Sequence, residues 1–465
     1  MIYLLTDFGS TYTKVMAADA ATGRIVAFAK AFTTIETDVT IGFNNALTEI
    51  TAQIGQTPVH KRLAASSAAG GLKMVSCGLV PDLTAKASRL AAASAGAKVV
   101  RTYSYELTEF EQMEIAEIAP DILLLTGGID GGNQKVLLHN AEMIAAIPLD
   151  FSVIVAGNRS AASATAAILE RGGKQVVVCA NVMPSFGKLN IIPAKGAIRD
   201  LFIANIITAK GLDTAAAMMD MEIIPTPLAV LEACELLSRG TDSADGMGEV
   251  MVYDLGGATT DVYSMADGTP RKANAFISGI VEPFAKRTVE GDVGMRYSQT
   301  ALYDLIAEDG IDAFCAAHNL SEADINEWIS ICAKDPGVLP LGEFAAYAPV
   351  DCAFAAEAIR ISALRHAGYV ERVFTPSGEV FSQYGKDLTT VSYVIGSGGA
   401  VINAADPAYI LKEAAYTPRD LNALKPLKPK LLLDKTNCLA AMGLLGRFEP
   451  QAALDIMKES FAELG

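Results

Sequence analysis

The sequence contains little histidine, no closely paired cysteines and few charges. Its 465 residues include only four histidines, which form neither HxxH nor HExxH, so a histidine-ligated metal centre is not expected. The seven cysteines are scattered and form no CxxC pair, which argues against a zinc knuckle or disulfide framework and suits reduced thiols in a cytosol. No GxSxG segment occurs, so a serine hydrolase of the α/β type is not expected.

Positive charges are fewer than negative ones, and long apolar runs are missing. The 37 Lys and Arg residues are outnumbered by 53 Asp and Glu, and the net charge of −16 repels nucleic-acid phosphates and anionic lipids. No stretch offers the roughly 20 uncharged apolar residues of a membrane span. The opening residues, MIYLLTDFGS, lack the basic and long apolar segments of a signal peptide. We therefore expect a cytoplasmic protein whose main partner is neither nucleic acid nor membrane.

What the chain does have is apolar material for more than one core. Hydrophobic residues make up 51% of it, and single cores stop growing at about 250–300 residues, so at least two domains are expected. Near the N-terminus, Ile2–Leu5, Val15–Asp19 and Ile25–Lys30 alternate with turns and predict a β-meander. The same rhythm returns about 250 residues later, from Glu249 to Met265. The sequence thus predicts one supersecondary unit twice.

Between the two meanders the rhythm differs. Short apolar runs such as Lys98–Thr102 and Ile122–Leu125 alternate with helical segments such as Phe110–Ile118. Continuous apolar strands that alternate with helices are typical of a parallel sheet covered on both faces. We therefore expect an α/β insertion at about residues 66–148.

The first candidate site lies in Thr6–Lys14, where a glycine turn follows an acid at the end of the first strand. Such a turn lets backbone N–H groups approach an anion, and the hydroxyls that follow it can donate to phosphate oxygens. Asp7 is placed to hold Mg²⁺ through water, and Lys14 can balance phosphate charge. An ordinary hairpin is the competing interpretation. The candidate phosphate-binding residues here are Gly9, Ser10, Thr11, Thr13 and Lys14.

Two further glycine turns are candidate nucleotide-binding segments. Asp254–Val262 again runs from an acid through a glycine turn to a hydroxyl pair, and two such hairpins are much harder to obtain by chance than one. Ile395–Ala400 is a glycine turn between a strand and a helix, where a backbone can approach a flat ring or sugar. It lacks GxGxxG spacing, so a dinucleotide site is not expected. The candidates are Asp254 for Mg²⁺ and Gly256, Gly257, Thr259, Thr260, Gly396, Ser397, Gly398 and Gly399 for a nucleotide.

In this order the three segments resemble the phosphate-1, phosphate-2 and adenosine motifs of the superfamily of actin, the heat-shock chaperone ATPases and the sugar kinases. Segments Leu189–Ile198 and Asp434–Leu445 resemble its two connecting helices. The resemblance implies an α/β fold of duplicated ribonuclease-H-like domains that bind ATP or ADP with Mg²⁺. The expected division is a first domain at 1–205 with the insertion, a second at 206–430, and a C-terminal strand and helix at 431–465 that return to the domain interface.

Finer motifs resemble one family within this superfamily. Ser66–Met74, Gly78–Thr84, Leu125–Asn133 and Glu290–Arg296 look like segments of the glutamate-mutase-associated MutL/GlmL family, which is unrelated to the mismatch-repair protein of that name. Its members accompany adenosylcobalamin-dependent carbon-skeleton and amino mutases. By likeness to diol-dehydratase reactivating factors, the family implies an ATP-dependent chaperone or reactivase. Permanent binding of cobalamin by the chain itself is not expected, because no ligating histidine site was found.

The chain departs from the superfamily at one position. In the heat-shock-chaperone members an acid precedes the proline that opens the first connecting helix, and this acid helps to position the attacking water. Here Ile192 precedes Pro193. Hydrolysis would then depend on Asp261 and Asp7, and a slow Mg²⁺-dependent ATPase or a nucleotide sensor is easier to defend than a fast enzyme.

Two other motifs remain open between a functional and a structural interpretation. Leu125–Asn133 places four glycines, an acid and an amide after a buried strand, where open α/β sheets bind ligands. Gly127, Gly128, Asp130, Gly131, Gly132 and Asn133 are candidates for a second ligand or a partner loop. A tight turn with an Asp or Asn cap is the alternative. Arg296 could hold a phosphate or carboxylate, although a structural salt bridge explains a lone arginine better.

Three other functions compete with that of a mutase accessory ATPase. A small-molecule kinase would need a catalytic aspartate over an acceptor hydroxyl, and no such residue stands out. An actin-like filament or scaffold protein is compatible with the insertion and the acidic charge. An activator of radical dehydratases would need a cluster-binding cysteine pair at a dimer interface, which the scattered cysteines do not supply.

Overall fold

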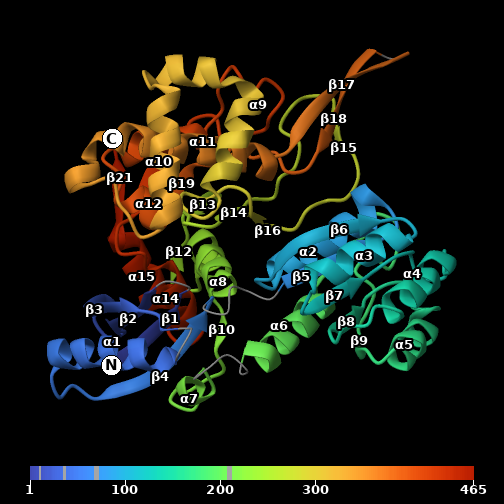
Figure 1. Ribbon diagram of the computed structural model, residues 1–465, viewed down its shortest axis with the longest axis horizontal. Coiled ribbons are helices and arrows are strands. Elements are labelled where there is room, and N and C mark those ends of the chain that lie inside the picture. Colours follow the sequence, from blue (N-terminus) through green and yellow to red (C-terminus); the bar gives the residue numbers. More distant parts are fainter. Residues whose placement is uncertain (10–11, 35–37, 68–72, 207–211, 377) are drawn as a thin grey trace.

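Two mixed β-sheets with the same strand arrangement organise the protein, and an all-parallel sheet is inserted into the first (Figure 1). The computed structural model describes residues 1–9, 12–34, 38–67, 73–206, 212–376 and 378–465. No helix in these ranges combines the length and the apolar character that a membrane span requires.

The strand order shows the duplication. The first sheet runs β3-β2-β1-β4-β10 and the second runs β16-β14-β13-β19-β20-β21. In both, the first three strands are antiparallel neighbours and the next two add in parallel, so the first sheet matches the first five strands of the second. The expected pair of ribonuclease-H-like units is confirmed. The first sheet comprises β1 (Ile2–Phe8), β2 (Tyr12–Asp19), β3 (Arg24–Phe32), β4 (Val59–Ser66) and β10 (Ile224–Pro225); the second comprises β13 (Val250–Leu255), β14 (Thr260–Met265), β16 (Ala285–Glu290), β19 (Tyr393–Ser397), β20 (Lys430–Asp434) and β21 (Phe461–Leu464).

The insertion is larger than the sequence suggested. Its sheet has the order β6-β5-β7-β8-β9 with every neighbouring pair parallel, the doubly wound arrangement. The expected end near residue 148 is wrong, because two more crossovers add β8 and β9 to the same sheet, which ends at Val178. The strands are β5 (Lys73–Gly78), β6 (Lys98–Ser104), β7 (Ile122–Leu125), β8 (Ser152–Val155) and β9 (Gln175–Val178); the helices are α2 (Lys86–Ser94), α3 (Glu109–Ile118), α4 (Lys135–Ala145), α5 (Ala162–Arg171) and α6 (Ile192–Ile206).

Helices cover both faces of the inserted sheet. Ile122 and Leu124 of β7 belong to an apolar cluster that includes α2 and α6, whereas Leu123 and Leu125 belong to a cluster with α3, α4 and α5. All four side chains are fully buried. A strand buried on both faces explains the continuous apolar runs that the sequence shows here.

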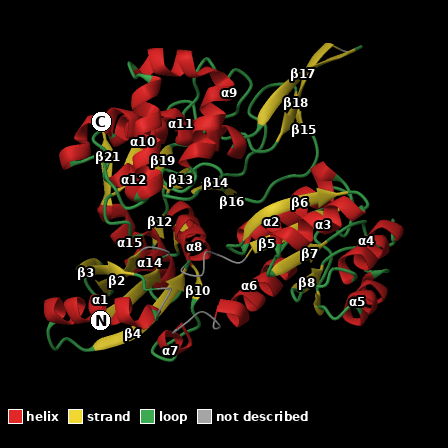
Figure 2. Ribbon diagram, in the orientation of Figure 1, coloured by secondary structure: helices red, strands yellow, loops and turns green. Residues whose placement is uncertain are grey.

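A layer of helices fills the space between the two mixed sheets. It consists of α8 (Thr226–Arg239), α14 (Leu439–Gly446) and α15 (Pro450–Ser460), which share one apolar cluster with residues of both sheets (Figure 2). The chain reaches α14 directly after β20, which lies beside β19 in the second sheet. The remaining helices cover the outer faces: α1 (Val39–Ile54) and α7 (Leu212–Ala216) in the first domain, and α9 (Gln299–His318), α10 (Glu322–Lys334), α11 (Ala348–His366), α12 (Gly399–Ile402) and α13 (Pro407–Leu411) in the second.

Alternation along the strands decides which side chains face this helix layer. In β1, Tyr3 and Leu5 join the interdomain cluster while Leu4 and Phe8 face the core with α1. In β13, Val250 and Val252 join the interdomain cluster, and Met251 and Tyr253 face the core of the second domain. Since residues two apart share a face, the strand-ending acids of β1 and β13 both lie on the interdomain side.

Three short strands form a separate sheet at the edge of the second domain. Its order is β15-β18-β17, with β15 (Ala275–Ile277), β17 (Tyr369–Thr375) and β18 (Gly378–Tyr384). Figure 1 shows the β17–β18 hairpin projecting away from the body of the protein beside the insertion. A two-stranded ribbon of β11 (Gly240–Thr241) and β12 (Ala244–Asp245) follows α8.

Candidate functional site

The two predicted phosphate hairpins close with the same backbone bond. The N–H of Gly9 donates to Tyr12 O at 3.1 Å, and the N–H of Gly256 donates to Thr259 O at 3.0 Å. A Cβ on Gly9 would lie 2.6 Å from Tyr12 O, and one on Gly256 would lie 3.1 Å from Thr259 O. Both turns therefore leave little or no room for a side chain at the glycine. Ser10 and Thr11, two of the predicted phosphate contacts, lie outside the described residues.

Strand register sets a charge pattern that differs between the hairpins. Asp7 lies opposite Lys14 in the first hairpin, and Asp254 lies opposite Asp261 in the second. Cross-strand partners share one face of the sheet, so all four side chains lie on the interdomain side. The structure thus brings the predicted acids and the lysine of both hairpins to one place between the domains.

Asp7 is held from two sides. Its carboxylate lies 3.9 Å from Lys14 Nζ and accepts a hydrogen bond of 2.6 Å from Thr226 Oγ1. Thr226 is the first residue of α8, the helix that runs from the first domain to the second. No sequence motif points to Thr226, because it is 219 positions away from Asp7. It fixes one carboxylate oxygen and leaves the other directed towards Lys14.

We expect Thr226→Val to weaken Mg²⁺-ATP binding by about tenfold, near the lower end of the cost of one hydrogen bond to a charged group. The change keeps the side-chain shape but leaves Asp7 free to rotate. Isothermal titration of both proteins measures the difference, and Thr48→Val is the matched control, since its hydroxyl bonds only within α1. An unchanged dissociation constant in Thr226→Val would show that the orientation of Asp7 is irrelevant to binding.

Asp254 is the least compensated acid of the group. Burial, and then the nearby charge of Asp261, raise the pKa of Asp254 to about 6, although Lys14 acts in the opposite direction. Asp7 and Asp434 add to the rise. Among the described residues its carboxylate has neither a hydrogen-bond donor nor an ion pair. A half-buried acid that lies near other acids fits a site that a cation completes.

Mg²⁺ is the cation that this donor set suits. Hard oxygen ligands that bind through water are typical for it, and Asp7 and Asp254 remain the predicted anchors. In the described part of the chain no group of three or more His, Cys, Asp or Glu side chains is arranged to bind a metal directly. When bound, Mg²⁺ would neutralise charge on a nucleotide's phosphates.

Asp261 is not a free carboxylate. Arg287 on β16 donates to its Oδ1 from Nε at 2.7 Å and from Nη2 at 2.6 Å. The guanidinium is buried, and the same arginine also reaches two backbone carbonyls at the end of α2. An acid held in this way is a positioned acceptor rather than a mobile base. The candidate catalytic role of Asp261 is therefore better described as orienting a water or a phosphate-bound cation.

Three predicted nucleotide contacts point elsewhere. Thr13 Oγ1 lies 3.0 Å from Thr33 Oγ1, and Thr260 donates to Val293 O at 2.8 Å; both are fully buried on the faces away from the helix layer. Ser397 is 2% exposed and donates to Asp434 at 3.4 Å. These hydroxyls stabilise the hairpins and the adjoining strands. Thr259 is half-buried and forms no side-chain bond with another described residue.

The predicted adenosine segment packs against the second hairpin. Gly398 has φ 85°, and a Cβ there would lie 2.4 Å from Leu255 O and 2.7 Å from Asp254 Oδ1. Gly396 is enclosed by Leu411, whereas Gly399 is exposed with room around it. Only Gly399 and the turn beside it therefore offer surface to a ligand. The close approach of Gly398 brings this turn next to Asp254.

Asp434 joins this turn to the helix layer. Its carboxylate accepts the N–H groups of Cys438 at 3.0 Å and Leu439 at 3.4 Å, at the start of α14. Burial raises the pKa of Asp434 although these bonds oppose the rise. The residue was predicted only as part of the second connecting segment. Its position shows how α14 and the glycine turn are fixed together.

The glycine-rich loop after β7 has structural reasons for its composition. Asn158 accepts from the N–H of Gly131 at 3.1 Å and donates to the carbonyls of Gly132 and Asn133, each at 3.1 Å. Asp130 accepts the N–H of Arg159 at 2.9 Å, and Asn133 accepts that of Val136 at 3.2 Å. Gly127 and Gly128 have positive φ, and a Cβ on Gly128 would lie 2.3 Å from Asn133 O. The capped tight turn therefore accounts for these residues, and a ligand or partner at this loop stays a prediction.

Arg296 forms the structural salt bridge that the sequence favoured. Its guanidinium bonds to Asp351 at 2.8 Å and to Val338 O at 3.1 Å, and it lies over the ring of Trp328. The neighbouring segment fastens the second hairpin, since the N–H groups of Met295 and Arg296 bond to Gly256 O and Gly257 O. The predicted first connecting helix is α6, and Ile192 at its start is 77% exposed.

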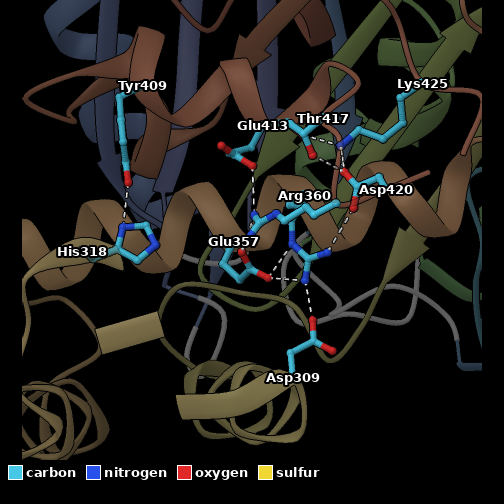
Figure 3. A network of polar contacts seen from close by, with 10 residues as sticks. Asp309, His318, Glu357, Arg360, Tyr409, Glu413, Thr417, Asp420 and Lys425 are labelled. Carbon is cyan, nitrogen blue, oxygen red and sulfur yellow. Dashed lines mark hydrogen bonds and ion pairs between the residues drawn. The ribbon is translucent and has the colours of Figure 1, made fainter. Parts of the chain in front are cut away.

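A cavity of about 540 Å³ lies away from the hairpins, between α9, α11 and residues 419–423. Arg360 and Asp420 line it and belong to the polar network of Figure 3, with Asp309, Glu357, Glu413 and Lys425. Arg419 forms ion pairs with Glu357 and Glu413 of this network. The cations of this network are already bound: Arg360 to Glu357, Asp309 and Asp420, and Lys425 to Asp420 at 2.9 Å. We therefore assign no ligand to this cavity.

Comparison with known proteins agrees with the motifs. The family model described as MutL protein matches residues 3–461. Protein MutL of Clostridium tetanomorphum is 43% identical over 459 residues, which are 98% of each chain.

Among solved structures the likeness is faint. The activator of the 2-hydroxyisocaproyl-CoA dehydratase from Clostridium difficile with bound ADPNP is 9% identical, with 99% of this chain and 98% of that chain covered and a TM-score of 0.33. Xylulose kinase from Bifidobacterium adolescentis is 11% identical, with 100% and 96% covered and a TM-score of 0.30. Such scores add nothing to the strand order described above. The family match and the curated relative do decide the relationship: the chain belongs to the MutL family, the glutamate-mutase-associated proteins and not the mismatch-repair ones.

Proposed function

We propose that this protein binds ATP or ADP with Mg²⁺ between its two hairpins and acts as an accessory ATPase, of the chaperone or reactivase type, for an adenosylcobalamin-dependent mutase. The observation that supports it best is the matched register of the hairpins. Asp7 with Lys14 and Asp254 with Asp261 lie on the interdomain side, near enough for Lys14 and Asp7 to act on the pKa of Asp254. Two phosphate-binding turns on separate domains suit a ligand whose binding draws the domains together.

The proposed turnover is slow. Ile192 stands where an acid would help to position water, and Asp261 is bound by Arg287. The energy for work on a partner then comes from different affinities of open and closed states for nucleotide, rather than from fast hydrolysis. Membership of the family supports a mutase as the partner, glutamate mutase or an aminomutase.

Titration calorimetry of the purified protein with ATP, ADP and AMP, with and without Mg²⁺, tests the proposed nucleotide binding. We expect Mg²⁺-dependent binding of ATP and ADP and much weaker binding of AMP, because AMP lacks the outer phosphates that the hairpins would hold. Absence of binding for all three nucleotides would contradict the proposal.

A test of the proposed accessory role requires a mutase. Purified glutamate mutase and an aminomutase, each inactivated during turnover, are incubated with the protein, adenosylcobalamin and Mg²⁺-ATP, and the recovered activity is measured. We expect recovery for one of them with ATP and none with ADP alone. Nucleotide binding without recovery for either enzyme would favour the kinase or filament alternatives, and sedimentation in the presence of ATP would separate these two.

A further inference from the structure

The end of helix α2 in the insertion touches the second hairpin through Arg287. This side chain is 3% exposed, and its Nη1 donates to Ala93 O at 3.3 Å and Ala97 O at 3.2 Å while Nε and Nη2 hold Asp261. Arg287 stands opposite Tyr263 in the strand register, and nearby acceptors keep its pKa raised even though burial alone would lower it. One rigid guanidinium therefore joins a carboxylate of the proposed nucleotide site to the carbonyl end of an insertion helix.

The same turn of the insertion also touches the segment behind the first hairpin. Gly96, with φ 86°, lies so close to the start of α8 that a Cβ would be 2.8 Å from Pro225 Cβ and 3.2 Å from Leu228 N. Between these two residues is Thr226, which holds Asp7. The turn Ala93–Ala97 thus contacts the supports of both hairpin acids, one on each domain.

The other end of α2 is tied to the second domain. Lys86 Nζ lies 2.6 Å from Glu282 Oε1, and Glu282 Oε2 lies 2.6 Å from Lys286 Nζ. Burial alone would raise the pKa of Glu282, but the two lysines lower it to about 2. Glu282 and Lys286 lie on the segment of the chain that continues into Arg287. Both ends of α2 are therefore fixed to the same stretch of the second domain. The insertion shares an apolar cluster with the first domain and is also tied to the second through both ends of α2.

Resting on the nucleotide site proposed above, we propose that Arg287 is a positioning residue that transmits the nucleotide state at Asp261 to the insertion through the turn Ala93–Ala97. ATP and ADP differ in the phosphate next to the hairpins, so they place Asp261 differently. Arg287 moves with Asp261 because the two side chains are bound together. The carbonyls of Ala93 and Ala97 then move with Arg287. The insertion surface offered to a partner then differs between the two nucleotide states.

Hydrogen exchange of the full chain, followed by mass spectrometry, tests this coupling in the apo, Mg²⁺-ADP and Mg²⁺-ATP states. In the wild type we expect the exchange rates of peptides covering Lys86–Ala97 to differ by about fivefold between ATP and ADP, the lower end of couplings between sites. Arg287→Lys keeps the charge but cannot hold Asp261 and two carbonyls together, so it loses this difference while still binding both nucleotides. Arg89→Lys, on the exposed face of α2, is the matched control and keeps the wild-type difference.

The remaining outcomes separate the coupling from the nucleotide site. A wild type that binds both nucleotides with equal exchange over α2, or an Arg287→Lys protein that keeps the difference, overturns the coupling and leaves the proposed function standing. A wild type that binds no nucleotide in calorimetry overturns both. Lys86→Ala should raise exchange in both states and keep their ratio, because it frees only the far end of α2. If circular dichroism shows that Arg287→Lys is unfolded, Asp261→Asn is the second variant, and retention of the difference in that protein contradicts the coupling.

Discussion

Asp254→Asn is expected to lower the affinity for Mg²⁺-ATP by about 100-fold, the upper range for one interaction with a charged group. The asparagine has the same shape but carries no charge to hold a hydrated Mg²⁺. The glycine turn at Gly398 packs closely against Leu255 and this side chain, and asparagine has the same shape, so the backbone should stay in place. Calorimetry with and without Mg²⁺ measures the loss. Normal Mg²⁺-ATP affinity in this variant would show that the site is assigned wrongly.

The same substitution should stabilise the nucleotide-free protein. The pKa of Asp254 is raised to about 6 by burial and by Asp261, above its value of 3.8 in an unfolded chain. A raised pKa means that the folded state prefers the protonated acid, so the wild type loses stability as the pH rises from about 4 to 6. Asparagine avoids this loss. We expect the variant to exceed the wild type by up to about 3 kcal/mol at pH 7 and by about 0.5 kcal/mol at pH 4.

Urea unfolding followed by tryptophan fluorescence can measure this difference. Trp328 is the only tryptophan of the chain and is fully buried in the core of the second domain, the domain that carries Asp254. Asp242→Asn, at an exposed acid after α8, is the control and should not change stability with pH. A stability gain that is equal at pH 4 and pH 7 would mean that the charge of Asp254 is not its cause.

Local patterns in the sequence predicted the sheets and the two hairpins. Glycine turns after strand-ending acids are short-range signals, and both hairpins fold as expected with the same backbone bond. The alternation of side chains along the strands explains why some of the predicted hydroxyls face away from the site. In the observed register Asp7 pairs with Lys14 and Phe8 with Thr13, so Thr13 must face away from the acid. Hydroxyl residues within one motif therefore lie on different faces of the sheet. The same alternation turns Thr260 away from Asp254.

Long-range partners could not be predicted from one sequence. Arg287 looks like any basic residue of a half-polar strand, and only the packing of α2 against β16 makes it a buried link. Thr226 looks like an ordinary residue before a proline at a helix start. The insertion boundary was missed for a different reason. Its later strands carry the same apolar signal as the earlier ones, and only pairing shows that β8 and β9 belong to the same sheet.

Arg360→Met should be among the most destabilising single changes in the second domain, at about 3–5 kcal/mol. Arg360 is 7% exposed and neutralises two buried acids, Glu357 and Asp420, with a third bond of 2.6 Å to Asp309 (Figure 3). Methionine fills much of the same space but leaves these acids with fewer partners. Trp328 fluorescence during urea unfolding reports the change, because α11 packs in the same core.

Two further variants identify the cause of that loss. Arg372→Met breaks an ion pair with Glu379 that is 62% and 40% exposed, and we expect it to cost less than about 1 kcal/mol. Arg360→Met combined with Glu357→Leu removes both members of the buried pair and should regain a large part of the lost stability, since replacing a buried pair by apolar side chains is often neutral. If the double variant is no more stable than Arg360→Met, the loss comes from packing around α11 rather than from an uncompensated buried charge.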